Sequence, residues 1–329
     1  MAAHVILVFV DGVGVPSHAR GSPFDDPGLP TWRILGGDLP PEGREPREGR
    51  LATLVPVDAG LGLPGLPQSA TGQTALLTGV NAAARLGRHR SGQPTPTLIR
   101  LLRADNLLLR LRGAGLPVAL ANSHSDGFLR WFARMRELWL AQEGARGRVD
   151  LHLHPPDPGR PAWLRPPASA WAADVAGVPL RGPKELERGL AVPHDLGPDP
   201  AEAGRRLAQL GRLHAFTLFE YWLTDEAGHR REASLIRARL HALDSFLGAL
   251  LEASDLSETL LLVASDHGNV EEPASRRHTT NPAFLALAGA GRERLVPRLR
   301  SLVDVAGAVQ EALGVSARQP MAAGPAARG

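Results

Sequence analysis

The sequence predicts an α/β fold with three layers, in which helices cover both faces of a mostly parallel sheet. Short apolar runs typical of buried strands alternate with segments whose apolar residues recur at helical spacing, and this alternation indicates βα units. The runs of strand type are His4–Val10, Leu116–Ala121, His214–Glu220, Thr259–Ala264 and Ala283–Ala288. Polar residues of metal-ligand type closely follow three of these runs. Because ligands of open α/β sheets bind where strands end, we expect the functional site at that edge.

Length and composition suit one large domain, or a core with a small second lobe. The chain has 329 residues, 43% of them hydrophobic, and a net charge of +3. Arginine supplies almost all of the 37 basic residues, because Lys184 is the only lysine. Most arginines alternate with Glu, Asp and Leu along helix-like stretches. Such interspersed charge indicates a solvated surface, so we expect no nucleic-acid partner.

The absence of cysteine excludes several kinds of site. Disulfides, thiolate metal sites and a cysteine nucleophile are all ruled out, so any metal ion must be held by oxygen and imidazole ligands. The apolar run Val5–Val10 is too short for a signal sequence and ends in Asp11. No apolar stretch is long enough to cross a bilayer. We therefore expect a cytoplasmic protein without a membrane partner.

The first strand-like run ends in Asp11-Gly12, which places a carboxylate at the end of a strand. Residues 17–64 are dense in Gly, Pro and charge and are expected to be mostly loop, with one short apolar stretch at Leu51–Val57. A helix is expected over Ala70–Leu77, because Pro67 precedes it and a glycine ends it.

The remaining elements continue the α/β pattern around an unusual stretch. A Leu/Arg-rich helix is expected over Thr97–Arg112, and amphipathic helices are expected over Ala201–Leu210 and Ala233–Leu251. After residue 126 the composition changes to clusters of Trp and Pro, which indicates an inserted cap rather than more sheet. We place the core at 1–126 and 201–319, the cap at 127–200 and a flexible tail at 320–329.

Seven residues of metal-ligand type lie in four short segments of the chain. They are Asp11, Ser69, Asp225, His229, Asp266, His267 and His278. Asp225 and His229 are four residues apart, so on a helical turn both side chains would point toward one ion. Asp266 and His267 would point to opposite faces of a regular strand unless Gly268 lets the backbone turn. Each motif alone is commoner as a turn or a surface pair, but the whole set at strand ends predicts a metal site.

Two divalent ions about 4 Å apart can clamp the attacking and leaving oxygens of a phosphoryl transfer. Ser69 is the predicted nucleophile for that reaction, because metal coordination lowers the pKa of a hydroxyl and a helix N-terminus favours an alkoxide and a phosphate. Thr71 is the alternative nucleophile and Thr74 a weaker one. Ser69 is preferred since it precedes the helix, where free N–H groups point.

These motifs resemble those of the alkaline phosphatase superfamily, most closely its branch of cofactor-independent phosphoglycerate mutases and phosphopentomutases. VFVDGVG is similar to the opening strand and metal aspartate of that branch, and SATGQ lies where its serine or threonine nucleophile falls. LTDEAGH, SDHGN and HTTNP match its remaining metal motifs in the same order. The resemblance covers residues 5–81 loosely and the region from residue 216 to the last helix well, and it implies an alkaline phosphatase-like fold.

The resemblance also implies how two metal ions would be shared. Asp225, His229 and His278 would hold one ion, while Asp11, Asp266, His267 and the Ser69 oxygen would hold the other. Zinc and manganese both suit this set. Two departures disfavour a mutase: Ala-Thr-Gly-Gln follows Ser69 in place of the acidic and His-containing mutase sequence, and the inserted stretch is much shorter than the mutase insertion.

We therefore predict a metal-dependent phosphoesterase that hydrolyses a small phosphorylated substrate through a phosphoserine on Ser69. The first alternative is transfer by a mutase or phosphodiesterase with the same site, and the second is a catalytically silent metal-binding scaffold. Asn122, which follows a predicted strand, and Arg88, which follows the nucleophile helix, are candidate substrate contacts.

Overall fold

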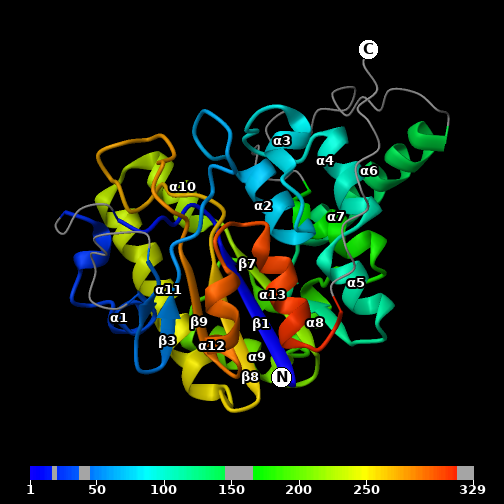
Figure 1. Ribbon diagram of the computed structural model, residues 1–329. Coiled ribbons are helices and arrows are strands. Elements are labelled where there is room, and N and C mark those ends of the chain that lie inside the picture. The colour runs from blue at the N-terminus through cyan, green and yellow to red at the C-terminus, as the bar shows by residue number, and fades with distance from the viewer. Residues whose placement is uncertain (17–20, 37–44, 145–165, 317–329) are drawn as a thin grey trace.

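A seven-stranded sheet forms the centre of the molecule (Figure 1). The computed structural model describes residues 1–16, 21–36, 45–144 and 166–316. The strands of this sheet are β1 (His4–Val10), β2 (Arg47–Glu48), β3 (Ala52–Leu54), β4 (Val118–Leu120), β7 (Phe216–Tyr221), β8 (Thr259–Ala264) and β9 (Leu285–Gly289). Their order across the sheet is β2-β3-β9-β8-β1-β7-β4.

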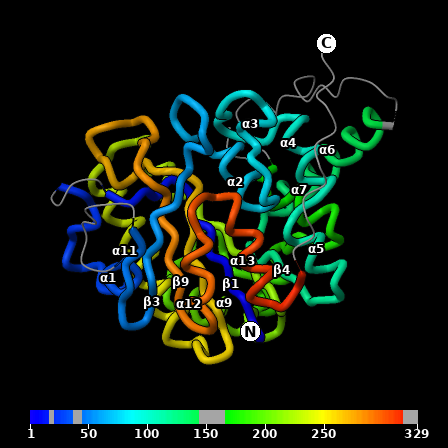
Figure 2. Tube along the Cα trace, viewed as in Figure 1, coloured from blue at the N-terminus to red at the C-terminus, as the bar shows by residue number. Residues whose placement is uncertain are grey.

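The sheet is mixed but mostly parallel, which confirms the predicted fold class. β1 pairs in parallel with β7 and β8, and β4 pairs in parallel with β7. β9 runs antiparallel to β8, and β3 runs antiparallel to β9. Figure 2 shows β3 and β9 side by side, although they come from opposite ends of the chain. Because β1, β7 and β8 are parallel neighbours, their carboxyl ends meet at one edge of the sheet.

Helices cover both faces of the sheet, so alternate residues of each central strand enter two different cores. Val5, Leu7 and Phe9 of β1 belong to one core, whereas Ile6 and Val8 belong to the other. The first core is completed by α2 (Ser69–Thr78), α4 (Pro96–Ala104), α5 (Leu107–Gly113), α7 (Ala168–Val175) and α13 (Asp304–Ala312). The second is completed by α1 (Pro30–Gly36), α9 (Pro200–Arg212), α10 (Leu223–Arg230) and α11 (Ala233–Ala253). Further helices are η1 (Pro23–Asp25), α3 (Ala82–Leu86), α6 (Asp126–Gly144), α8 (Pro183–Glu187), α12 (Arg292–Leu295) and η4 (Val296–Arg298).

Two local features differ from the sequence prediction. The single helix expected over Thr97–Arg112 is two helices, because Asn106 begins a new one: its side-chain oxygen accepts the Leu109 N–H at 3.0 Å. The stretch expected to be mostly loop also contains α1, whose Trp32 stacks between two phenylalanine rings in the second core. Tertiary packing of one aromatic face stabilises this short helix, and such packing leaves little trace in a Gly- and Pro-rich sequence.

The proposed insertion at 127–200 contributes to the main core. Trp139 and Trp171 are fully buried and belong to the core cluster that also contains α2, α4 and α5. A two-stranded parallel sheet joins β5 (Asn122–Ser123) to β6 (Val192–Pro193). The boundaries of a separate cap stay a prediction, and the proposed tail at 320–329 lies outside the described residues. Among the helices in the described ranges, none is long and apolar enough to cross a membrane.

Candidate metal centre

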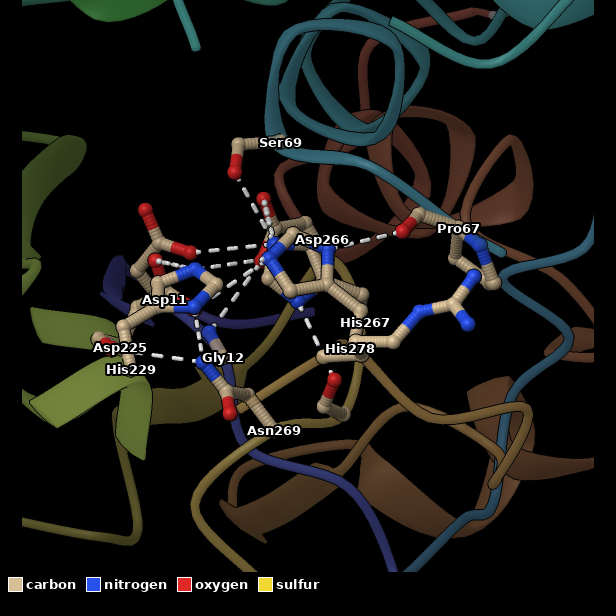
Figure 3. Close-up of polar contacts among 12 residues, drawn as sticks. Asp11, Gly12, Pro67, Ser69, Asp225, His229, Asp266, His267, Asn269 and His278 are labelled. Carbon is tan, nitrogen blue, oxygen red and sulfur yellow. Dashed lines mark hydrogen bonds and ion pairs between the residues drawn. The ribbon is translucent and has the colours of Figure 1, made fainter. Parts of the chain in front are cut away.

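The side chains of the predicted ligands converge at the edge of the sheet where β1, β7 and β8 end (Figure 3). Asp11 directly follows β1, and Asp225 and His229 lie one helical turn apart on α10, which follows β7. Asp266 and His267 follow β8. The loop after them folds back, so that Gly268 forms a β-bridge with the residue after His278.

The first cluster contains Asp225, His229 and His278, whose ligand atoms lie within 4.8 Å of one another. The Nε2 atom of His229 lies 3.3 Å from Oδ2 of Asp225, and Nε2 of His278 lies 3.6 Å from Oδ1 of the same carboxylate. Solvent reaches this cluster through His229, whose side chain is 45% exposed. Both imidazoles therefore share one carboxylate at a position open to a small ligand.

The tautomers of the two imidazoles are set by backbone carbonyls. Nδ1 of His229 lies 2.7 Å from the Arg276 carbonyl oxygen, and Nδ1 of His278 lies 2.8 Å from the Pro67 carbonyl oxygen. Each Nδ1 therefore carries a hydrogen and donates it, which leaves an Nε2 lone pair on each ring. The two Nε2 atoms are only 3.1 Å apart. Two lone pairs this close require a positive charge between them, either a proton or a metal ion, so the donor set fits a cation.

The second cluster surrounds Nε2 of His267. This atom lies 3.3 Å from Oδ1 of Asp11, 3.6 Å from Oδ2 of Asp266 and 2.9 Å from Oγ of Ser69. Within the part of the chain that the structure describes, both of those carboxylate oxygens are buried and accept no hydrogen bond. Buried oxygens without a donor are costly unless a cation binds them. Asp11, Asp225 and His267 also have ligand atoms within 4.8 Å of one another, so Asp225 lies between the two clusters.

The pKa shifts of the buried carboxyls also indicate a cation site. Burial raises the pKa of Asp266 to about 7, and the neighbouring Asp225 charge adds to the shift. Burial also raises the pKa of Asp11 well above its usual value, with the charges of Asp266 and Asp225 acting in the same direction. Burial would raise the pKa of Asp225 as well, but the hydrogen bond with His229 and the charge of His267 hold it below its usual range. The centre therefore concentrates negative charge that divalent cations would neutralise.

Ser69 is the first residue of α2, and its buried hydroxyl faces the second cluster. The hydroxyls of the two alternative nucleophiles, Thr71 and Thr74, form hydrogen bonds with backbone groups. Thr71 donates to the Gln68 carbonyl at 3.0 Å and accepts the Arg90 N–H at 3.3 Å, and Thr74 donates to the Ala70 carbonyl at 2.7 Å. Of the three hydroxyls, only that of Ser69 points at the predicted ligands.

A glycine next to Asp11 lets the first and third segments approach each other. Gly12 has a φ of +71°, a left-handed conformation that side chains disfavour. A Cβ at this position would also lie 2.6 Å from Oδ1 of Asp225. The Asp-Gly pair therefore does more than end a strand, because any larger residue would push Asp11 and Asp225 apart.

Sequence reasoning missed two side chains that hold the predicted ligands. Asn269 donates from Nδ2 to Oδ1 of Asp225 at 2.7 Å, and Gln73 donates from Nε2 to Oδ2 of Asp11 at 3.2 Å. Gln73 lies one helical turn after Ser69, so helical spacing was a usable signal for it. Asn269 is part of the SDHGN segment, but its partner is 44 residues away in sequence and no local pattern indicates the pair.

The two predicted substrate contacts lie in different surroundings. The side-chain amide of Asn122 donates to the Glu220 carbonyl at 2.7 Å and accepts the Glu220 N–H at 2.9 Å, so it joins β5 to the end of β7. Arg88 is exposed just after α3. A role in substrate binding stays a prediction for both residues.

Comparison with known proteins finds a family match for the C-terminal part of the chain. Residues 201–317, which include five of the seven predicted ligands in α10 and the loops after β8, match the model of the Metalloenzyme superfamily. The C-terminal part of the chain is therefore similar to this superfamily. A 2,3-bisphosphoglycerate-independent phosphoglycerate mutase from Onchocerca volvulus is 29% identical over 145 residues. That match covers 40% of this chain and 28% of the mutase, so the chain spans well under half of the relative's length.

Solved structures share the fold of the chain. The PH0037 protein from Pyrococcus horikoshii superposes with a TM-score of 0.54 at 14% identity, covering 97% of this chain and 99% of that one. An alkaline phosphatase from the Antarctic bacterium TAB5 superposes with a TM-score of 0.54 at 13% identity, covering 95% and 99%. At these identities the likeness shows the fold alone. The chain therefore has an alkaline phosphatase-like α/β fold.

Proposed function

We propose that the protein is a metal-dependent phosphoesterase that uses Ser69 as its nucleophile. The observation that carries this proposal is the position of the Ser69 hydroxyl, which is buried at the start of α2 and 2.9 Å from Nε2 of His267. This hydroxyl faces the second ligand cluster. The family match and the fold make phosphoryl transfer the chemistry to expect at such a site.

The ligand set fits two divalent ions, for which zinc and manganese are the candidates. Asp225, His229 and His278 would hold one, and Asp11, Asp266, His267 and the Ser69 oxygen would hold the other. When bound, the ions would supply positive charge that stabilises the transferring phosphoryl group and makes a hydroxyl or a water a better nucleophile. The close Nε2 atoms of His229 and His278 and the donor-free carboxylate oxygens of Asp11 and Asp266 support this assignment.

The residues of the chain account for the two steps of hydrolysis. Oγ of Ser69 attacks phosphorus, the ester P–O bond breaks and the alcohol leaves with a proton, which produces phosphoserine. Water then attacks the same phosphorus, the bond to Oγ breaks, and phosphate is released as Ser69 recovers its hydrogen. The start of α2 assists both steps: Gln68 makes no side-chain cap hydrogen bond there, so the first N–H groups of the helix are available to phosphate oxygens. The Thr71 N–H is the exception, because it donates to the Arg90 carbonyl at 3.4 Å.

Transfer to a second hydroxyl is the alternative outcome of the same first step. The match to a mutase favours it, but that match covers only 28% of the mutase. A small phosphorylated substrate would suit either outcome. A catalytically silent metal-binding scaffold would bind ions at the same ligands without any turnover.

The test is an assay of phosphomonoesters, phosphodiesters and phosphosugars with added Mn²⁺ or Zn²⁺. We expect Ser69→Ala to lower kcat at least about 10³-fold while the fold is retained. Ser257→Ala is the matched control, because Ser257 is exposed and precedes β8 at the opposite end of the strand. Mass spectrometry of the wild-type protein, quenched during turnover, should find one phosphoryl group on Ser69.

Three outcomes would change the proposal. Unchanged turnover in Ser69→Ala would move the nucleophile to Thr71 or to water. Phosphate that moves between substrates without being released would indicate a transferase. Metal binding without turnover of any substrate would favour the silent scaffold.

A further inference from the structure

Glu271 is a buried carboxylate outside the predicted ligand set, and four hydrogen bonds converge on it. It lies in the loop after β8 and is only 1% exposed. Its Oε2 accepts the backbone N–H of Gly14 at 2.9 Å and that of Asn269 at 2.8 Å. Its Oε1 accepts the Thr279 hydroxyl at 2.6 Å and the Asn281 side-chain amide at 3.1 Å. Both oxygens are therefore fully used by donors of this chain.

The four donors come from three loops, and each loop carries predicted metal ligands. Gly14 lies three residues after Asp11, Asn269 lies two residues after His267, and Thr279 directly follows His278. One carboxylate thus joins the loop after β1, the loop after β8 and the returning segment that supplies the last histidine. Hydrogen bonds from neutral donors to a charged acceptor are stronger than neutral ones, and here they act out of water.

Two glycines leave the space that this carboxylate needs. A Cβ at Gly14 would lie 2.3 Å from Oε1 of Glu271, and a Cβ at Gly268 would lie 2.2 Å from the same oxygen and from the Thr279 hydroxyl. A Cβ atom does not approach an oxygen to which it is not bonded so closely, so any other residue would displace the carboxylate. The backbone bridge between Gly268 and Thr279 further holds the two loops in register.

We propose that Glu271 is a positioning residue that sets the separation between the two ligand clusters. Its hydrogen bonds hold His278 of the first cluster and Asp11 and His267 of the second cluster in one frame. The proposal rests on the proposed two-metal site, because a fixed separation matters only if both positions bind ions. Residues behind metal ligands typically change metal affinity or activity about 10- to 100-fold when they are lost.

The test is metal titration of chelator-treated protein with Mn²⁺ alone, followed by calorimetry. Glu271→Gln keeps the shape of the side chain but replaces one acceptor oxygen with an NH₂ group, which would face a donor. We expect two binding events in both proteins, with affinities about 10- to 100-fold weaker in Glu271→Gln. Glu258→Gln is the matched control, since Glu258 is exposed before the other end of β8 and should bind as wild type does.

Spin coupling between two bound Mn²⁺ ions is a second measurement. A purely structural role of Glu271 would leave this coupling unchanged. Electron paramagnetic resonance at saturating Mn²⁺ should show altered coupling in Glu271→Gln while circular dichroism is unchanged. If Glu271→Gln does not fold, Thr279→Val replaces it, because this variant removes one of the four hydrogen bonds and keeps the side-chain volume. We expect a loss of affinity of a few fold in Thr279→Val.

Failure of this inference can be told apart from failure of the proposed function. Wild-type affinities and coupling in folded Glu271→Gln, or in Thr279→Val where that variant is used, would overturn the role of Glu271 and leave the metal site intact. A wild-type protein that binds no Mn²⁺ would instead overturn the two-metal site itself, and the inference with it.

Discussion

Gly72 packs directly against Asp266, and the contact leaves no room for a side chain. A Cβ on Gly72 would lie 2.9 Å from both the Cβ and the carbonyl oxygen of Asp266. Gly72 lies in the first turn of α2, so this contact joins the helix that carries Ser69 to the loop that carries two predicted ligands. The distance between the predicted nucleophile and the predicted metal ligands therefore depends on the absence of a side chain at residue 72.

We predict that Gly72→Ala lowers kcat by about 10²-fold, because a shift of about 1 Å between reacting groups has that effect. Gly307→Ala is the control, since Gly307 is also helical but has open space around its Cα hydrogen. That variant should be slightly more stable than wild type. Steady-state kinetics and thermal denaturation would measure both effects. Equal kinetics in the two variants would contradict the packing argument.

Removal of one imidazole should remove one ion. In His229→Ala the first cluster keeps only Asp225 and His278, whereas the second cluster retains all of its ligands. We expect the bound Zn²⁺ or Mn²⁺ content to fall from two ions to one and turnover to be lost. His241→Ala is the control, because His241 is an exposed histidine paired with Asp26 and lies outside both clusters. Elemental analysis after dialysis would give the stoichiometry, and two ions in His229→Ala would refute this ligand assignment.

The pH dependence of stability follows from the buried carboxyls. Burial raises the pKa of Asp266 to about 7 and that of Asp11 well above its usual value. A carboxyl with a raised folded-state pKa stabilises the fold below its unfolded pKa, and this contribution is lost as pH rises through the folded value. Asp225, with a lowered pKa, keeps its contribution over the same range. We expect these two carboxyls to lower the unfolding free energy of the chelated protein as pH rises from about 4 to about 7.

Bound divalent ions should reverse this loss, because they favour the ionised carboxylates. Thermal denaturation with chelator and with Mn²⁺, over the same pH series, would measure both curves. Asp266→Asn is the control variant, because the amide of Asn does not ionise. The stability of this variant should therefore vary less with pH. If the melting temperature of the chelated wild type falls no more with pH than that of chelated Asp266→Asn, the prediction is contradicted.

The break between α4 and α5 leads to a prediction that concerns only the stability of the fold. Asn106 is fully buried, caps α5 through Oδ1 and donates from Nδ2 to the Leu102 carbonyl at 2.8 Å. We expect Asn106→Ala to lower the unfolding free energy by about 2–3 kcal/mol, since a cap and a buried hydrogen bond are both lost. Thr95→Ala removes a more accessible cap of α4 and should cost about 1 kcal/mol. Denaturant unfolding would compare the two, and equal losses would show that the buried bond adds nothing.

Much of the fold was predictable because strand burial and helix periodicity are local properties. The runs at His4–Val10 and Thr259–Ala264 coincide with β1 and β8, and the helix expected over Ala70–Leu77 extends by one residue at each end. The direction of β9 was not predictable, since an apolar run looks the same in either orientation. The break at Asn106 was missed because the apolar spacing continues across it.

The types of predicted ligand, their order and their positions at strand ends could be read from the sequence, because each motif is short and its spacing is carried by one turn or one strand. Which atoms face one another depends on the packing of distant segments. The Nε2 atoms of His229 and His278 meet because carbonyls of Arg276 and Pro67 orient the rings. Glu271 reaches donors up to 257 residues away. Such contacts arise when parallel strands bring distant loops to one edge, and no local pattern records which loops will meet there.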